Sequence, residues 1–342
     1  MIKVFEVYGN EYEMGCQIGK KFKLYLAQKI NTYEKVINEN KDIYEKVKAM
    51  EEKLKKTYPK CLDEIYGRAD GAEVPRDAML LMFFPEIFKQ IDGCTTVILK
   101  KNNNSVLFAH NEDDRNYNIE NVAIVKYDYE DYWIVGYTMA EKLTGSSFAY
   151  NSYGIVFSSN YIYDIKIDLN NISRYIMVRD VMNSKSIEEV IYKMKNSKVA
   201  SAFSLNVLDV NSNKVINIEK DIKDVYITDI TDRYARSNHF ICKKDNLPNE
   251  PISSKFRYNK SKELLQMLNN TDSNIDDLVN ILKYETDDYL ESTYKNPEKY
   301  NDKSVTVSTF CIDSESKEIT IYDYLGKSRL NFKYNEFDIK NM

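Results

Sequence analysis

The sequence predicts an α+β protein in which two sheets of antiparallel strands pack together under helices. Two observations favour this class. The first 93 residues show mainly helical spacing of apolar side chains, whereas short β-rich runs separated by Asn, Asp and Gly turns begin at Cys94. Later helices stand between groups of strands, and no linker or repeat divides the chain. One structural domain is therefore expected over residues 1–342.

The segment before Cys94 is expected to form one strand and several helices. Residues 2–8 alternate between apolar and polar side chains, as a strand does. Helical spacing runs from residue 11 to about residue 50, and a second helix is predicted over 51–70. A third apolar stretch, AMLLMFFPEIF, follows Pro75.

The segment from Cys94 onward is expected to consist mostly of strands. The first of them are the runs CTTVILKK, SVLFAHNED, NVAIVKYDY, YWIVGYTMA, SSFAYNSYG and IVFSSNYI. Helices are predicted at 173–198 (a pair), 255–269 and 274–284, and further strands at 202–210, 214–219, 225–229, 304–312 and 317–324.

Composition narrows the class of protein. The net charge is −5 without any basic block, which argues against a nucleic-acid groove and against binding to an anionic membrane. The N-terminus lacks the zones of a signal peptide, and no apolar run reaches the roughly 18 residues of a membrane span. Five scattered cysteines without a CxxC pair suggest reduced thiols and no zinc site. A cytoplasmic globular protein is expected.

The sharpest local signal is the run Asp92-Gly93-Cys94-Thr95-Thr96, which lies where helical sequence gives way to strands. A cysteine there could be an ordinary buried strand residue. However, Gly93 can adopt backbone geometries that a strained scissile bond requires. A break after Gly93 would give Cys94 a free α-amine, whose usual pKa of about 8 suits a general base. Cys94 is thus a candidate nucleophile.

Two polar segments hold the only two histidines of the chain. One is AHNEDD, which contains His110 at the end of a β-rich run, and the other is RSNHF, which contains His239. Each could be a plain turn. A metal site built from His110, Asp113, Asp114 and His239 is conceivable, but no helical HxxxH spacing supports it, and no metal is expected.

Taken in order, DGCTT, AHNEDD, NSYGIVFSSN, RSNHF and SSKFRY resemble the acyl-coenzyme A:6-aminopenicillanic acid acyltransferase family. These isopenicillin N acyltransferase-like proteins are related to choloylglycine hydrolases and penicillin V acylases. The leading runs YEMGCQIGK and YPKCLDEIYGRADGAEV are also similar, so the resemblance spans roughly residues 8–260, with a weaker echo at SVTVSTFCIDSESKEI.

The resemblance implies an N-terminal-nucleophile hydrolase with an αββα sandwich, made as a precursor that cleaves itself before a cysteine. The matching bond is Gly93–Cys94, which would divide the chain into residues 1–93 and 94–342. Cys94 then matches the nucleophile, and Asp113 matches the carboxylate that orients the new α-amine. Asn238 matches the side-chain donor of the oxyanion hole, and Asn160 matches a second position that lines it.

Two further features follow from the resemblance. Arg257 matches an arginine near the nucleophile, and His110 stands where the bile-salt relatives carry arginine, so Asp113 could be held differently here. Residues 284–303 match nothing in the family pattern and are candidates for substrate specificity.

The leading hypothesis is a cysteine amidohydrolase or acyltransferase that acts on a small N-acyl amide through an acyl-Cys94 thioester. No Rossmann or P-loop glycine pattern is present, so no cofactor is expected and coenzyme A binding does not follow from the sequence. One alternative is a papain-like thiol peptidase that pairs Cys94 with His239. Another is a catalytically silent binding protein. A homo-oligomer is possible.

Overall fold

The computed structural model describes residues 2–88, 93–163, 166–243, 251–300, 303–324, 326 and 328–337. Its strands are β1 (Lys3–Tyr8), β2 (Gly93–Lys100), β3 (Val106–Arg115), β4 (Val122–Asp128), β5 (Trp133–Met139), β6 (Phe148–Asn151), β7 (Ile155–Tyr161), β8 (Phe203–Asp209), β9 (Lys214–Lys220), β10 (Val225–Asp229), β11 (Arg233–Arg236), β12 (Ser304–Asp313), β13 (Glu318–Asp323) and β14 (Arg329–Lys333). The helices are α1 (Glu11–Glu39), α2 (Lys41–Thr57), α3 (Pro59–Ala72), α4 (Arg76–Met82), α5 (Arg174–Val181), α6 (Ile187–Asn196), α7 (Ile252–Gln266) and α8 (Ile275–Leu282), with short 3₁₀ turns η1 (Pro85–Phe88) and η2 (Asn116–Asn121).

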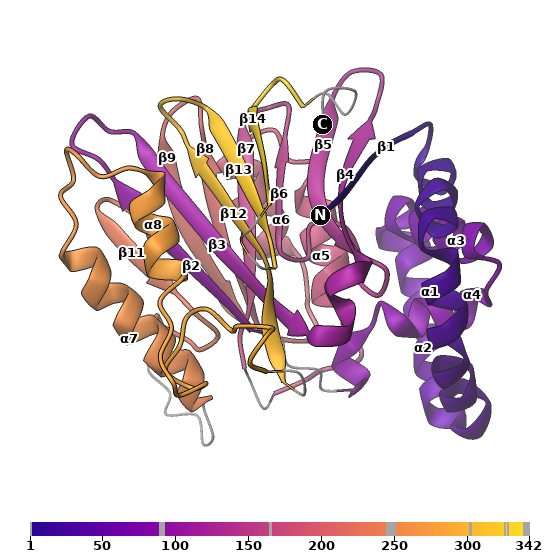
Figure 1. Cartoon of the computed structure of the whole chain (residues 1–342). Coiled ribbons are helices and arrows are strands. Elements are labelled where there is room, and N and C mark those ends of the chain that lie inside the picture. Colours follow the sequence, from indigo (N-terminus) through magenta and orange to yellow (C-terminus); the bar gives the residue numbers. More distant parts are fainter. Residues whose placement is uncertain are drawn as a thin grey trace.

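The described strands form two sheets (Figure 1). The larger sheet has the order β1-β4-β5-β6-β7-β8-β9-β10, and the smaller has the order β11-β2-β3-β12-β13-β14. Neighbouring strands are antiparallel, except that β1 runs parallel to β4. The strand β1 comes from the segment before Cys94, so that segment contributes directly to the larger sheet.

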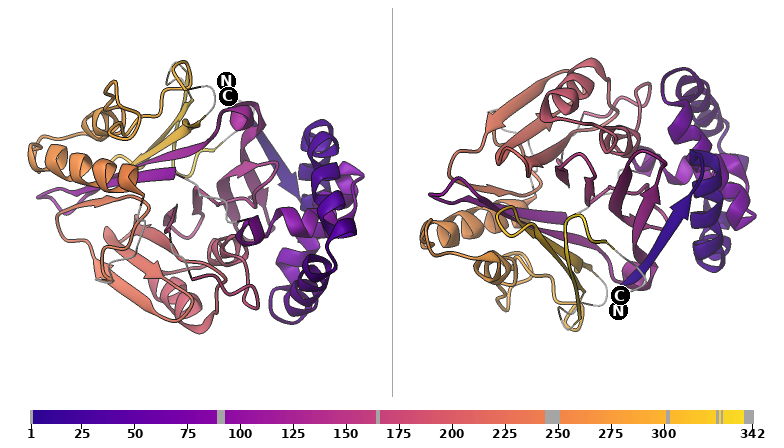
Figure 2. Two further views of the ribbon diagram at one scale, coloured as in Figure 1. Left: turned by 90° about the horizontal axis from the view of Figure 1, so that it is seen from below. Right: turned by 90° about the horizontal axis from the view of Figure 1, so that it is seen from above.

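The sheets are stacked between helices in four layers (Figure 2). One hydrophobic cluster joins α1–α6 to one face of the larger sheet, and a second fills the space between the two sheets. A third joins α7 and α8 to the outer face of the smaller sheet. This arrangement confirms the predicted α+β class and the αββα sandwich, because each sheet buries both of its faces.

The helices before Cys94 pack closely through glycines. A Cβ at Gly15 of α1 would lie 2.3 Å from the carbonyl oxygen of Glu64, and a Cβ at Gly67 of α3 would lie 2.1 Å from that of Tyr12. Any side chain at either position would push the two helices apart. Close packing of the two helices therefore explains the glycines in the runs YEMGCQIGK and YPKCLDEIYGRADGAEV.

The element predictions differ from the structure in a few places. The helix expected over 11–50 is two helices, because Asn40 ends α1 and caps α2, its side chain accepting a 3.1 Å hydrogen bond from the backbone N–H of Ile43. The short strands β11 and β14 were not predicted, since RYAR has four residues without alternation and RLNFK, although it alternates, has only five. No helix in the described residues is both long and apolar enough to cross a membrane.

Candidate active site

Cys94 is the second residue of β2 and faces the space between the two sheets. In the register of β2 with β3, Cys94 lies opposite Glu112, and Ile98 lies opposite Phe108. Ile98 and Phe108 belong to the cluster between the sheets. Because side chains two residues apart share a face of a strand, Cys94 and Glu112 point the same way.

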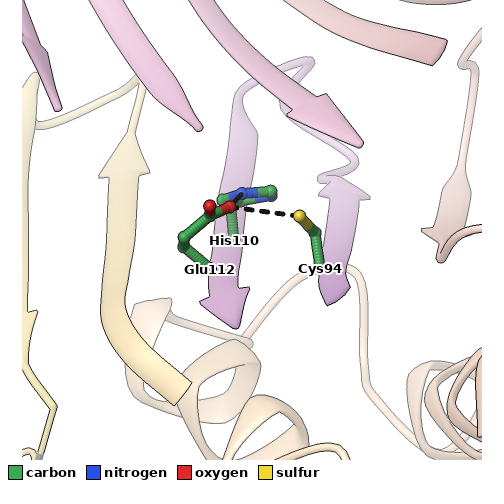
Figure 3. A group of neighbouring side chains, drawn as sticks. All are labelled: Cys94, His110 and Glu112. Atoms are coloured by element: carbon green, nitrogen blue, oxygen red, sulfur yellow. Dashed lines mark hydrogen bonds and ion pairs between the residues drawn. The ribbon is translucent and has the colours of Figure 1, made fainter. Parts of the chain in front are cut away.

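The sulfur of Cys94 is hydrogen-bonded to a carboxylate (Figure 3). Cys94 Sγ lies 3.1 Å from Glu112 Oε2, and both side chains are buried. The ring of His110 lies beside them on the same strand as Glu112, with Nε2 3.9 Å from Glu112 Oε2. The thiol of Cys94 thus donates a hydrogen bond to Glu112.

Glu112 is in turn part of a buried charge network. Lys142, in the loop between β5 and β6, places its Nζ 3.1 Å from Glu112 Oε1 and 2.6 Å from Asp114 Oδ2. All three side chains are buried. Burial of isolated charges is costly, so the ammonium group stabilises the two carboxylates and fixes the position of Glu112.

Donor atoms of Cys94, His110 and Glu112 lie within 4.8 Å of one another, as the ligands of a metal ion would. The surroundings favour another interpretation. Lys142 sets a positive charge 3.1 Å from Glu112 that would repel a cation. The two ring nitrogens of His110 already contact the hydroxyls of Thr96 at 2.8 Å and Ser147 at 3.1 Å. We interpret the group as a hydrogen-bonded cluster around the sulfur of Cys94.

The backbone of Cys94 is held by two of the predicted site residues. Its N–H donates to Asn238 Oδ1 at 3.1 Å, and its carbonyl oxygen accepts from Arg257 at 2.6 Å. Arg257 also donates to Asn238 Oδ1 at 2.7 Å and to the hydroxyl of Thr95 at 2.8 Å. Asn238 Nδ2 donates to the carbonyl oxygen of Tyr161 at 2.8 Å. Asn238 and Arg257 thus lie at the backbone of Cys94, and the oxygen of Asn238, not its nitrogen, faces Cys94.

Asp113 lies on the opposite face of β3 from Glu112, next to the residue before the nucleophile. It pairs with Gly93 across the two strands, and a Cβ built on Gly93 would lie 3.1 Å from Asp113 Oδ2. Thr306 donates to Asp113 Oδ1 at 2.7 Å. A β-bulge in β12 between Thr306 and Ser308 gives the strand an extra residue beside this pair.

Burial raises the pKa of Asp113 to about 6, although the charges of Arg257 and Lys295 and the hydrogen bond from Thr306 oppose the shift. Burial also lowers the pKa of Lys295 to about 7, with the Arg257 charge acting in the same direction and Asp113 against it. Lys295 belongs to the stretch 284–303 that the sequence left unassigned. That stretch therefore reaches the Asp113 side of the site.

The raised pKa of Asp113 predicts a pH-dependent stability. An unfolded aspartate titrates near pH 4, so between about pH 4 and pH 6 the folded chain binds more protons at this position, and its stability falls as pH rises. Asp113→Asn cannot titrate and should remove this slope. In a Cys94→Ala background, the variant should gain on the order of 2 kcal/mol between pH 4 and pH 7 relative to its parent. Urea unfolding at both pH values measures the free energy of unfolding of the two proteins. The same change with pH in both would contradict the raised pKa of Asp113.

Asn160 on β7 supplies a buried amide that faces the site from the larger sheet. Its Oδ1 accepts from the hydroxyl of Thr96 at 2.9 Å and from Asn206 Nδ2 at 3.0 Å. Its Nδ2 has no hydrogen-bond partner among the described residues. Thr96 shares a face of β2 with Cys94, so this unused donor lies on the nucleophile's side of the strand.

The two histidines have different positions. His110 lies beside Cys94 and Glu112, as described above. His239 contacts the hydroxyl of Ser254 through Nδ1 at 2.8 Å and packs edge-on against Tyr258 in the middle of α7. The imidazole near the cysteine sulfur is therefore that of His110 and not the one that a Cys94–His239 peptidase would use.

Sequence reasoning missed Glu112 and Lys142. A usable signal was present for Glu112, since a period of two along β3 puts His110, Glu112 and Asp114 on one face and Asn111 and Asp113 on the other. Lys142 has no such signal, because it lies in a loop 30 residues farther along the chain.

A protein-family model matches residues 99–327, and its family is described as acyl-coenzyme A:6-aminopenicillanic acid acyl-transferase. This chain belongs to that family. The match includes Asp113, Asn160, Asn238 and Arg257. It also includes the stretch 284–303, for which the sequence alone showed no resemblance to the family. It begins five residues after Cys94, so the leading helices lie outside it.

The chain is also similar to one curated relative and to solved structures. The chain is 24% identical over 237 residues to the beta-alanyl-dopamine/carcinine hydrolase of Drosophila melanogaster, with 60% of each chain covered. The match thus spans less than two thirds of that relative's length. Among solved structures, a conjugated bile acid hydrolase variant from Clostridium perfringens has a TM-score of 0.50 at 14% identity, covering 72% of this chain and 94% of the other. A penicillin V acylase from Agrobacterium tumefaciens has a TM-score of 0.45 at 14% identity, covering 72% and 87%.

The acyl-transferase family to which the chain belongs and the four-layer fold both agree with the predicted enzyme class, one that acts on amide bonds. They confirm the resemblance drawn from DGCTT and AHNEDD. The division at Gly93, the roles of individual residues and the substrate are matters for proposal.

Proposed function

We propose that this protein is a self-cleaving cysteine amidohydrolase whose nucleophile is Cys94, freed by a break after Gly93. The observation that carries the proposal is the way in which Cys94 is held. Its sulfur faces a buried polar space, while Asn238 and Arg257 bind its backbone N–H and carbonyl. The contact of the sulfur with Glu112, in a strand whose backbone these two side chains fix, supports a chemical role for Cys94.

In the mature enzyme the α-amine of Cys94 would act as the base. Asp113 supports this role, because its carboxylate lies against Gly93, and the new amine would form at the adjoining nitrogen. Asn238 Oδ1 already accepts a hydrogen bond from that nitrogen and would help Asp113 to orient the amine. The amine takes the thiol proton, and the thiolate attacks the substrate carbonyl.

The attack creates an oxyanion that needs donors in a site without bulk water. Asn160 Nδ2 supports this role best, since it is buried and has no partner among the described residues. The second N–H of Asn238 Nδ2, whose first contact is to Tyr161, is the other candidate. Collapse of the intermediate releases the amine and leaves an acyl-Cys94 thioester, which water then hydrolyses. We favour water over a second amine because water needs no acceptor site.

The two pieces, 1–93 and 94–342, would stay together after cleavage as one domain. The first piece provides β1, which pairs with β4, and its helices share a core with the larger sheet. Neither piece would bury its apolar surface alone.

The substrate is proposed to be a small N-acyl amide with an apolar acyl part. A pocket of about 260 Å³ lies among α1, η1 and η2, lined by Lys29, Thr32, Tyr33, Phe88, Tyr117 and Glu141. Glu141 adjoins Lys142, which contacts Glu112, so the pocket lies on the Lys142 side of the nucleophile. Aromatic rings with two charged side chains suit an apolar group that carries one polar end.

A substrate panel tests this function. N-acyl amino acids and phenoxyacetyl-type amides should be hydrolysed, with little activity on folded proteins, and mass spectrometry would read the products with and without added amines. The 24% identical insect relative, named as a hydrolase of beta-alanyl-dopamine and carcinine, supports including N-β-alanyl amines. Turnover confined to long peptides would favour a thiol peptidase. No turnover, with Cys94 resistant to alkylation, would favour a silent binding protein.

A further inference from the structure

We propose that Glu112 is the general base for self-cleavage, a role distinct from that of the α-amine in later turnover. This inference rests on the proposed break at Gly93–Cys94. Before the break, the nitrogen of Cys94 is an amide that donates to Asn238 Oδ1 and cannot accept a proton. The uncleaved chain therefore needs another base to activate the thiol.

The geometry places Glu112 in that position. Its Oε2 lies 3.1 Å from Cys94 Sγ, a normal distance for a hydrogen bond to sulfur, and both residues are buried between the sheets. The register pairs them directly across β2 and β3, so the contact is set by the backbone and not by a mobile loop. A general base must be within hydrogen-bond reach of the proton that it removes, and Glu112 meets this condition.

Lys142 gives the carboxylate a second partner on its other oxygen, at 3.1 Å. Asp114, which Lys142 also contacts at 2.6 Å, holds the ammonium group in place. The ion pair thus holds Glu112 Oε1, and it leaves Oε2 directed at the sulfur.

In the proposed step, Glu112 first accepts the thiol proton and later returns it. The carboxylate takes the thiol proton as the sulfur attacks the carbonyl carbon of Gly93, forming a C–S bond. The C–N bond to Cys94 then breaks, and Glu112 returns the proton to the departing nitrogen, which becomes the α-amine. Water hydrolyses the Gly93 thioester, giving the Gly93 carboxylate and restoring the Cys94 thiol. One water is consumed, and no other reactant is needed.

Glu112→Gln tests the inference, because the amide keeps the size of the side chain but cannot take the proton. Precursors made by cell-free synthesis would be followed by intact mass over time. Self-cleavage should slow by roughly 10²–10⁴-fold, the usual contribution of a general base. It should also rise with pH, since hydroxide would have to replace the carboxylate, whereas a merely structural role would not change the pH profile.

Asp323→Asn is the control, since it removes another buried carboxylate, at the end of β13, that contacts Ser328 and has no part in the proposed step. It should cleave at nearly the wild-type rate. If Glu112→Gln fails to fold, as thermal unfolding would show, Glu112→Asp decides, because it keeps the charge beside Lys142 and withdraws it from the sulfur. Cleavage of a folded Glu112 variant at the wild-type rate overturns the inference. A wild-type chain that stays uncleaved would instead refute the proposed self-cleavage.

Discussion

Cys94→Ala is expected to yield a single full-length chain with no measurable amide turnover. The substitution removes the sulfur that faces Glu112, so neither the break at Gly93 nor an acyl-enzyme can form. Loss of a nucleophile typically lowers turnover by at least about 10⁴-fold. The fold should persist, because alanine is well tolerated in a buried strand position and the backbone contacts to Asn238 and Arg257 do not use the side chain.

A matched control is available in the same sheet. Cys311 on β12 is buried in the apolar cluster beneath α7 and α8 and has no part in the proposed chemistry. Cys311→Ala should be cleaved and turn over substrate as the wild type does. If Cys94→Ala were processed normally, another residue would be the nucleophile.

Asn238→Ala is expected to lower the turnover number by roughly 10²–10³-fold, the usual effect of losing one oxyanion donor. The residue also accepts from the nitrogen of Cys94 and from Arg257, so the two functions of its amide must be separated. Asn238→Asp keeps an acceptor oxygen at this position and loses the N–H donors. If donation to the oxyanion matters, both variants should be about equally slow.

The turnover numbers of Asn238→Ala and Asn238→Asp together separate the two functions of the amide. An Asn238→Asp enzyme close to wild-type turnover would show that the residue only orients the α-amine. Stopped assays at saturating substrate separate the turnover number from binding, and thermal unfolding shows whether either variant has lost its fold. Near-wild-type turnover in both would remove Asn238 from the site.

Much of the fold could be predicted from periodicity. Long strands such as β8 and β12 are buried on both faces and rich in branched or aromatic residues. Their local sequence therefore predicts a strand. By contrast, β11 has four residues, including two arginines, and forms only because β2 offers an edge for pairing. Such strands depend on tertiary contacts that a local sequence does not contain.

Some residues of the candidate site could likewise be predicted from the sequence, whereas others depend on tertiary contacts. The order of DGCTT, AHNEDD and RSNHF was enough to bring Cys94, Asp113 and Asn238 together, because a family pattern records positions that are distant in the chain. The partner of the sulfur was not foreseen. Glu112 adjoins Asp113 in sequence but lies on the other face of β3, and its importance depends on Lys142, which only the fold brings near.

The central claim is tested most directly by the intact mass of the purified wild-type chain, followed by N-terminal sequencing. The account predicts two associated polypeptides, residues 1–93 and 94–342, the second beginning with Cys94, while Cys94→Ala gives one mass. A wild-type preparation that is fully active and yet shows only the full-length mass would contradict it.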